Sequence, residues 1–386
     1  MPRVLSSVEN LTHSLLGATL AEAALPSTAS PAQRRTFYVT GILAANLPDA
    51  DLIYTSITTP PLGYLLHHRG HTHTVVGLIG LAALFAIAFV IPSLRRNTVP
   101  VAGRFWLLVV AALASHLVAD GWNSYGVHPF YPIDNRWFYG DAVNIFEPWL
   151  WVVLGTVVAM NARSRSRRFV IAGFIAAISF AAAGVGVIDV FVLVPLGVAA
   201  WLLVLTLRRR RPAIRAITSL GVVAVFVTLS YGLGAVARAE AIASVSHSGA
   251  SVVDVVLSPR PGNLLCWNAL LLQRDEDALV MRRANIPIAP QWFSACRASG
   301  IDWRPVARQS IDQLRDALAD CRTRAWLQFG RAPAIRETWI ADVRFGEPGR
   351  GNFSGMTMTA SPSNAECPRH ITHWAYPRAD VLLSDR

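Results

Sequence analysis

The sequence predicts a mostly α-helical protein: a polytopic helical membrane bundle of about 7–8 helices, followed by a small α+β exoplasmic C-terminal domain. Of the 386 residues, 53% are hydrophobic and only 15% are charged, whereas soluble domains carry about a quarter charged residues. Long apolar runs fill the chain up to Ala237, and a polar composition with all four cysteines follows. Lipid is therefore the expected solvent of the first part.

The apolar runs are long enough to form transmembrane helices, which need roughly 17–25 residues. They occupy residues 75–92, 105–119, 148–160, 169–188, 190–207 and 216–237. The two shortest need flanking aromatic residues or partner helices to complete a span. Shorter segments at 11–25 and 36–53 are expected to precede them. Residues 1–25 lack a basic start followed by an apolar core, so no cleavable signal peptide is expected.

Arginine sets the expected topology. The net charge of +11 comes from 35 basic residues, all of them arginine. The clusters are Arg34–Arg35, Arg95–Arg96 with Arg104, Arg163 to Arg168, and Arg208 to Arg215. Each falls between apolar segments, and such connections stay in the cytoplasm. A multi-pass protein of the cell (inner) membrane is therefore expected, with an exoplasmic C-terminal domain. Membrane topology and contact with lipid headgroups explain the positive charge better than nucleic-acid binding. The sequence leaves the oligomeric state open.

Three parts are predicted: a membrane-embedded region at 1–160 that carries the chemistry, additional transmembrane helices at 161–238, and an exoplasmic α+β domain at 239–386. In the last part LLCWNALLL, ALVMRRANI, TWIADVRF and GMTMTA favour strands, and SIDQLRDALADCRTRAWLQF favours one amphipathic helix. The cysteines of this part are Cys266, Cys296, Cys321 and Cys367. An even number in an exported domain predicts two disulfides with three connectivities; four buried thiols are the alternative.

Histidine and carboxylate residues gather at the exoplasmic ends of the first helices. Seven of the ten histidines lie in the first 128 residues. The candidates are His13 in NLTHSLLGA, Asp49 and Asp51 in ANLPDADLIY, His67, His68, His71 and His73 in HHRGHTHTVVG, His116 and Asp120 in ASHLVADGWN, and Glu147 in NIFEPW. The helices after residue 161 carry almost no titratable group. One end of the bundle is therefore the expected site.

Local spacing in these segments favours metal binding. His116 and Asp120 are four residues apart, which places them on one face of a helix. Pro48 is expected to end a helix and to leave an extended segment in which Asp49 and Asp51 point the same way. Imidazole and carboxylate ligands favour a divalent metal, with zinc preferred and manganese or iron also suitable, and the absence of cysteine argues against a structural zinc site.

In the histidine-rich segment, Gly70 is expected to allow a turn, and Thr72 to Thr74 resemble a helix start with a capping hydroxyl. His68 and His73 are favoured as ligands over His71 and His67. Each assignment has a structural alternative. These are an ion pair for His116 with Asp120, turn chemistry for Asp49 and Asp51, an interfacial histidine for His13, and a helix-start carboxylate for Glu147. His128, His247, His370 and His373 are left without a metal role.

The motifs THSLLGA, LPDADL, HHRGHTHT and SHLVADGWNSYGV, in this order, resemble the YdjM-like (LexA-regulated) family of membrane-bound metal-dependent hydrolases. The resemblance covers about residues 10–130. It maps the family motifs onto Thr12–His13, Asp49 with Asp51, His68 to His73, and His116 with Asp120. Thr74 replaces the usual serine, and His67 and His71 are additional. SPRPGNLLCWNALLL and IADVRF more weakly resemble the exported region of longer members.

Together, the residues and the resemblance imply a hydrolase that acts at the exoplasmic interface on a lipid-like ester, with a phosphoester favoured. The expected metal ligands are His13, Asp49, Asp51, His68, His73, His116 and Asp120. Arg69 is expected to contact a phosphate oxygen, with headgroup contact as its alternative. Glu147 or Asp141 is the candidate general base. Membrane lipids or lipid-linked molecules are the expected partners.

Two other functions remain as alternatives. A transporter usually places ionisable groups near the membrane centre on discontinuous helices, whereas here they crowd one interface. A non-catalytic, metal-stabilised membrane scaffold with a partner-binding tail would have the same ligands without hydrolysis.

The topology leads to a first prediction. A reporter that is active only outside the cytoplasm should be active when fused after Asp254 and silent after Arg210, because the last apolar run carries the chain outward. The reverse pattern would move the candidate ligands to the cytoplasmic face.

Overall fold

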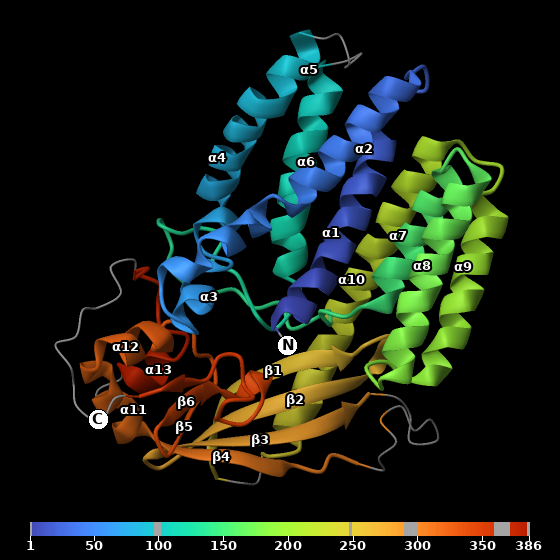
Figure 1. The fold of residues 1–386 in the computed structure, drawn as a ribbon. Helices are drawn as coiled ribbons and strands as arrows, with labels where there is room; N and C mark the ends of the chain where they lie inside the picture. Colours follow the sequence, from blue (N-terminus) through green and yellow to red (C-terminus); the bar gives the residue numbers. More distant parts are fainter. Residues whose placement is uncertain are drawn as a thin grey trace.

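The structure is a computed structural model that describes residues 2–95, 102–246, 249–288, 296, 300–358 and 371–383. A bundle of upright helices forms the first part, and a sheet domain lies at one end of it (Figure 1). The helices of the bundle are α1 (Pro2–Ala24), α2 (Pro31–Asn46), α3 (Leu62–His67), α4 (Val75–Phe85), α5 (Ile91–Arg95), α6 (Ala102–Asp120), α7 (Pro148–Asn161), α8 (Arg165–Gly184), α9 (Leu193–Leu207) and α10 (Pro212–Ala243).

Short helical turns complete this part of the chain. They are η1 (Pro48–Ile53), η2 (Thr55–Ile57), η3 (His71–His73), the π-helical η4 (Ala86–Val90) between α4 and α5, and η5 (Val190–Val192) before α9. Thr74 caps α4 by accepting a hydrogen bond from the Gly77 N–H, as its sequence predicts.

Four described helices are long and apolar enough to cross a membrane: Gly103–Asp120, Arg165–Gly184, Val190–Leu207 and Pro212–Ala243. A fifth is added if Leu62–His73 and Val75–Phe89, which are bent by 70° relative to each other, count as one span. The helical membrane-protein class is confirmed. The number of 7–8 helices stays a prediction, because among the described helices α1, α2 and α7 do not meet the same criterion.

The outer faces of α8 and α9 carry large apolar side chains that no protein covers. Phe169, Phe174 and Phe180 on α8 and Trp201 on α9 are all more than half exposed. A contiguous apolar surface of this kind is costly in water and favourable in lipid. These exposed apolar side chains therefore support lipid as the solvent around α8 and α9.

The connections α1–α2, α7–α8 and α9–α10, together with the end of α5 and the start of α6, lie at the end of the bundle remote from the sheet (Figure 1). The described arginines of the four clusters belong to these connections, and Arg96 lies outside the described residues. They share one end of the bundle, as the alternation of helices predicts, and the sheet domain occupies the other end.

Helices α1 and α2 cross at two glycines. A Cβ atom on Gly17 would lie 2.3 Å from the carbonyl oxygen of Gly41, and one on Gly41 would lie 2.4 Å from that of Gly17. Small residues permit this close backbone approach between membrane helices. The contact holds α2 against α1 and leads the chain into η1.

The C-terminal part is α+β, as predicted. Strands β1 (Ser251–Arg260), β2 (Asn263–Asp275), β3 (Ala278–Pro287) and β4 (Arg304–Ser310) form an antiparallel sheet in that order. Strands β5 (Pro333–Arg336), β6 (Trp339–Asp342) and β7 (Met356–Thr357) form a second one. Apolar side chains of α10 and β2, among them Ala237, Ala241 and Trp267, share one core.

The strands expected from sequence correspond to β2, β3, β6 and β7. Strand β1 was not expected. Asp254, and a bulge between Val252 and Asp254, interrupt the apolar alternation of this strand.

The single helix expected from Ser310 onward is wrong. The chain forms α11 (Ile311–Asp316), η6 (Ala317–Ala319), α12 (Cys321–Leu327), then η7 (Val343–Phe345) and α13 (Ala379–Leu382) further on. Asp320 caps α12 by accepting from the Thr323 N–H, and a capping aspartate starts a new helix.

A disulfide joins Cys266 and Cys296, whose Cα atoms are 5.2 Å apart. Cys321 is also disulfide-bonded, and no cysteine is free among the described residues. Cys367 lies outside the described residues. One predicted bridge is thus confirmed, and the alternative of four free thiols is wrong.

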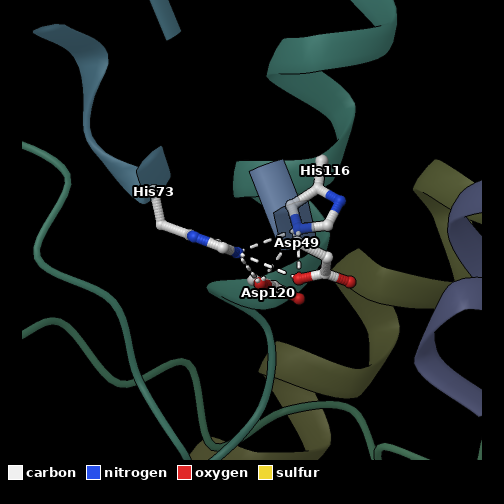
Figure 2. A group of neighbouring side chains, drawn as sticks. All are labelled: Asp49, His73, His116 and Asp120. Carbon is white, nitrogen blue, oxygen red and sulfur yellow. Dashed lines mark hydrogen bonds and ion pairs between the residues drawn. The ribbon is translucent and has the colours of Figure 1, made fainter. Parts of the chain in front are cut away.

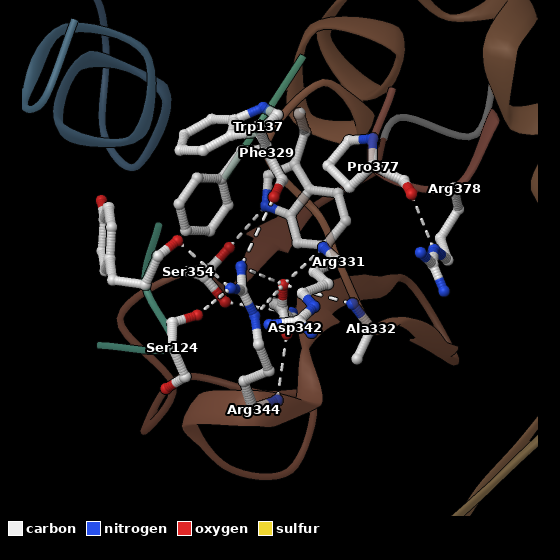
Figure 3. A network of polar contacts seen from close by, with 12 residues as sticks. Ser124, Trp137, Phe329, Arg331, Ala332, Asp342, Arg344, Ser354, Pro377 and Arg378 are labelled. Carbon is white, nitrogen blue, oxygen red and sulfur yellow. Dashed lines mark hydrogen bonds and ion pairs between the residues drawn. The ribbon is translucent and has the colours of Figure 1, made fainter. Parts of the chain in front are cut away.

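The connection between α6 and α7 attaches the sheet domain to the bundle (Figure 3). The Arg331 guanidinium donates two hydrogen bonds of 2.8 Å to the Asp141 carboxylate, and its Nε donates one of 2.9 Å to Asp254. Arg344 donates to the Ser124 carbonyl oxygen at 2.6 Å and pairs with Asp342 at 2.8 Å. Because Arg331 and Asp141 are buried, removal of either partner would leave an uncompensated charge.

The close crossing of α1 and α2 predicts that one methyl group added at Gly41 destabilises the protein. Gly41→Ala should lower the free energy of unfolding by about 1–3 kcal/mol, because the new Cβ meets backbone atoms that cannot move aside. Gly80→Ala on α4 is the matched control, since nothing lies within 4 Å of its Cβ position. Thermal unfolding of both variants in detergent measures the difference, and equal melting temperatures would contradict the close crossing.

Candidate metal centre

Four side chains, three of them buried and that of Asp49 partly buried, converge between η1, η3 and α6 (Figure 2). The Nε2 atoms of His73 and His116 are 3.0 Å apart, and Asp49 Oδ1 lies 3.4 Å from each. Asp120 Oδ2 lies 3.2 Å from the His73 Nε2 atom and 3.5 Å from that of His116. His116 and Asp120 share a helix face at the predicted four-residue spacing.

These separations fit a cation held at the centre of the four atoms. Zinc binds nitrogen and carboxylate oxygen at about 2.0–2.2 Å. Tetrahedral ligands at that range are about 3.3–3.6 Å from one another. The Nε2 atoms of His73 and His116 lie 3.0–3.5 Å from each other and from the two carboxylate oxygens. The geometry also suits other divalent metals with nitrogen and oxygen ligands.

The hydrogen bonds on the far side of each ring direct both Nε2 atoms inward. His116 Nδ1 lies 2.7 Å from the Ala45 carbonyl oxygen, which can only accept, so Nδ1 carries the proton. His73 Nδ1 lies 3.2 Å from Asp51 Oδ2. Both Nε2 atoms therefore present lone pairs, as metal-binding histidines do. Asp120 Oδ2 is buried without a hydrogen-bond donor, which a bound cation would compensate.

Arg69 holds the other oxygen of Asp120. Its guanidinium lies 3.2 Å from Asp120 Oδ1 and donates to the Asp120 carbonyl oxygen and to Asn123. The backbone of Arg69 has φ of 61°, a left-handed conformation that is uncommon outside glycine and clusters at functional sites. Its N–H donates to Asp51 Oδ2 at 3.1 Å, which secures that conformation.

A second group consists of Asp49, Asp51 and His68 and shares Asp49 with the first. Asp51 Oδ1 is 3.1 Å from His68 Nδ1, and its Oδ2 accepts from the Thr72 hydroxyl at 2.8 Å. Asp51 therefore orients His68 and His73 with both of its oxygens.

The two groups together contain six of the seven predicted ligands. His13 lies outside both. Its ring stacks on that of His116 with centroids 3.8 Å apart, and its Nε2 is 3.3 Å from Asp120 Oδ1. His13 thus borders the cluster through Asp120.

One local expectation was wrong. Residues 48–53 form a 3-10 helix and are not extended, because Pro48 at the first helical position sacrifices no hydrogen bond. Asp49 and Asp51 therefore diverge, and Asp49 faces His116 while Asp51 faces His68. The turn expected between His68 and His71 forms, and its left-handed residue is Arg69.

The other histidines lie apart from both groups. His67 Nε2 is bonded to the Thr58 hydroxyl at 2.8 Å, and His71 is exposed. His128 is buried against Trp137 and Trp374, and burial lowers its pKa to about 3. His373 is exposed in the C-terminal part, and His247 and His370 lie outside the described residues.

The two candidate bases have other partners. Glu147 caps α7, where its oxygens accept from the N–H groups of Trp149 and Gly262. Asp141 pairs with Arg331 and Arg238. Neither belongs to a metal-binding group among the described residues, so a catalytic role of Glu147 stays a prediction that this geometry does not support.

A cavity of about 380 Å³ lies beside the cluster. His68, Arg69 and Asn123 border it from the bundle side, and residues of β1, β2 and β3 border it from the sheet domain. Volumes of about 300–1,000 Å³ are typical of small-molecule sites. The cluster therefore adjoins a space that could hold a ligand.

Apolar helices and a buried Asp/His cluster define a membrane protein with a candidate divalent-metal centre. Residues 8–191 match the family model described as YdjM inner membrane protein, the family that the sequence motifs resemble. The matched region contains the whole cluster and ends before the sheet domain.

The chain is also similar to the uncharacterized protein YfhP of Bacillus subtilis (strain 168). The two are 25% identical over 124 residues, which cover 32% of this chain and 36% of that protein. The chain thus matches only about a third of that relative's length. No solved structure matches.

The cluster predicts which residues retain metal. His116→Ala and Asp120→Ala should each lose most of the bound metal and still insert and fold, because helix packing supplies most of the stability of a membrane bundle. Asp51→Asn, which keeps the four ligands of the first group but weakens the orientation of His73, should lower metal affinity about 10–100-fold. Mass spectrometry of metal in protein purified without chelator measures these changes.

His71→Ala, in the same segment but exposed, is the matched control and should keep the metal of the wild type, as should His373→Ala. Full metal content in the His116 and Asp120 variants, or none in the wild type, would disprove the metal centre.

Proposed function

We propose that the chain is a membrane-bound, metal-dependent hydrolase of a lipid-like ester, preferably a phosphoester, at the exoplasmic face of the membrane. The observation that carries this proposal is the convergence of Asp49, His73, His116 and Asp120 beside a cavity. Zinc is the favoured metal because the ligand atoms are nitrogen and oxygen at tetrahedral separations.

When bound at such a site, a divalent ion supplies a Lewis acid and activates water for attack at neutral pH. The residues of the chain hold and orient this centre. Asp51 keeps the His73 ring in position, and Arg69 does the same for Asp120. Asp49 is the most exposed of the four ligands, at 10%.

Arg69 has a second task in this proposal. It lines the cavity while it pairs with Asp120, so its charge would lie close to the group under attack. Guanidinium groups suit phosphoryl oxygens well. In hydrolysis of a phosphodiester, water forms the new oxygen–phosphorus bond, the ester P–O bond breaks, and the leaving alcohol takes a proton. A phosphoester substrate is therefore favoured over a carboxylic ester.

The position of the cluster supports an interfacial, lipid-like substrate. The cluster lies where the bundle meets the sheet domain, at the end opposite the arginine-rich connections (Figure 1). By the charge rule those connections are cytoplasmic. Substrates with apolar chains reach such a site from the bilayer without leaving it.

Hydrolysis by the purified protein tests this function. The wild type in detergent, loaded with zinc or manganese, is assayed on bis(p-nitrophenyl) phosphate, p-nitrophenyl butyrate and a phospholipid panel. We expect phosphodiester cleavage that chelator abolishes and added metal restores. His116→Ala should lose at least about 100-fold in kcat/KM, which corresponds to roughly 2.7 kcal/mol, and His71→Ala should retain the wild-type rate.

A metal-loaded protein that cleaves none of these compounds would refute the hydrolase. It would favour the metal-stabilised scaffold, because four protein ligands are also the usual number in structural metal sites. Metal-dependent flux of a solute in proteoliposomes, without hydrolysis, would favour the transporter.

A further inference from the structure

The cavity beside the cluster is built by two parts of the chain that are far apart in sequence. Asn123 and Tyr125 follow α6, whereas Ser258, Asn268 and Arg283 belong to strands of the sheet domain. Removal of the sheet domain would leave the cavity without one of its walls. The region that matches the family model supplies the cluster, but it does not supply these strands.

The lining of the cavity is cationic. It contains Arg69, Arg283 and Arg344 together with His68, and no aspartate or glutamate is among the described residues that line it. A partly enclosed space with three guanidinium groups and no carboxylate attracts an anion. Phosphate matches the guanidinium fork better than other common biological anions, because two parallel hydrogen bonds can form.

Two of the three arginines are used by the protein. Arg344 pairs with Asp342 and donates to the Ser124 carbonyl oxygen, and it is 2% exposed. Arg69 pairs with Asp120 and is 1% exposed. Both guanidinium groups serve mainly to hold the structure around the cavity.

Arg283 differs from both. It is exposed on β3, and the one hydrogen bond that its guanidinium makes in the described structure is to the Val343 carbonyl oxygen, at 2.7 Å. The negative charge of Glu347 attracts the Arg283 guanidinium, but the Glu347 carboxylate is ion-paired with Arg336 at 3.2 Å. A guanidinium has five N–H donors, so Arg283 retains donors for a ligand in the cavity.

The lining also contains apolar side chains, next to polar ones such as Asn123 and Asn268. Ile145 comes from the bundle side, and Val256, Leu270, Phe345 and Phe353 come from the C-terminal part. Such side chains favour hydrocarbon over water. The cavity therefore suits a molecule that carries an anionic group and an apolar portion.

We propose that the sheet domain forms one wall of the substrate site and that Arg283 binds the phosphate group of an amphipathic substrate there. This inference rests on the proposed function for the reaction, but the binding step can be measured without it. It assigns the C-terminal domain a direct part in substrate recognition.

The test compares adjacent arginines on one strand. Arg283→Gln removes the charge of one of the three arginines in the cavity wall. Arg282→Gln is the matched control, because neighbouring residues of a strand point to opposite faces and Arg282 does not line the cavity. Isothermal titration of the full-length protein in detergent uses three probes: sn-glycerol 3-phosphate, micellar dihexanoyl phosphatidic acid, and uncharged glycerol.

We expect both phosphates to bind the wild type and Arg282→Gln equally, and to bind Arg283→Gln at least about 10-fold more weakly, because a hydrogen bond to a charged group is lost. Glycerol should not bind. The lipid should bind more tightly than glycerol phosphate if the apolar lining contributes; equal affinities would refute the amphipathic part of the proposal and indicate a soluble phosphate.

Equal phosphate affinity in wild type and Arg283→Gln, or equal loss in both variants, would overturn the inference. Loss in Arg283→Gln alone, with no ester hydrolysed by the wild type, would support the anion site and refute the hydrolase. Hydrolysis of a phosphoester with an unchanged KM in Arg283→Gln would support the hydrolase and refute the role of Arg283.

Discussion

The buried carboxylate of Asp120 is the constraint around which the N-terminal half is arranged. A charge removed from water costs several kcal/mol unless partners compensate it. One oxygen of Asp120 meets Arg69 and His13, and the other faces His73 and His116. These partners come from α1, α6 and the segment between α3 and α4. The carboxylate can be buried only when these elements lie together, so the site and the packing of the bundle depend on each other.

The connection between α6 and α7, which begins directly after Asp120, links the buried site to the sheet domain. It supplies Ser124 and Asp141 to arginines of the sheet domain, and its Asn144 donates to Ser258 of β1. The sheet domain is therefore attached to the segment that leaves the metal cluster. This arrangement explains why the cavity beside the cluster has walls from both parts of the chain.

Much of the candidate site could be predicted from sequence. The pairing of His116 with Asp120 follows from helical periodicity, and arginine clusters at alternate connections place the histidines at one end of the bundle. The error at Pro48–Asp51 arose because proline both ends helices and begins them. A hydrogen bond from the Arg69 N–H to Asp51, 18 residues away, accompanies the helical turn that forms. A contact between residues this far apart leaves no pattern in the local sequence.

The sequence by itself determined the helical membrane class, the common end of the arginine clusters and the set of candidate ligands, because composition and short-range spacing carry that information. Only the tertiary structure decided which imidazoles meet. His73 and His116 are 43 positions apart, and Arg331 and Asp141 are 190 apart. It also separated Asp49 from Asp51 and placed Arg283 in the wall of the cavity that adjoins the cluster. Contacts at such distances depend on how whole helices and strands pack, and no pattern within one segment encodes that packing.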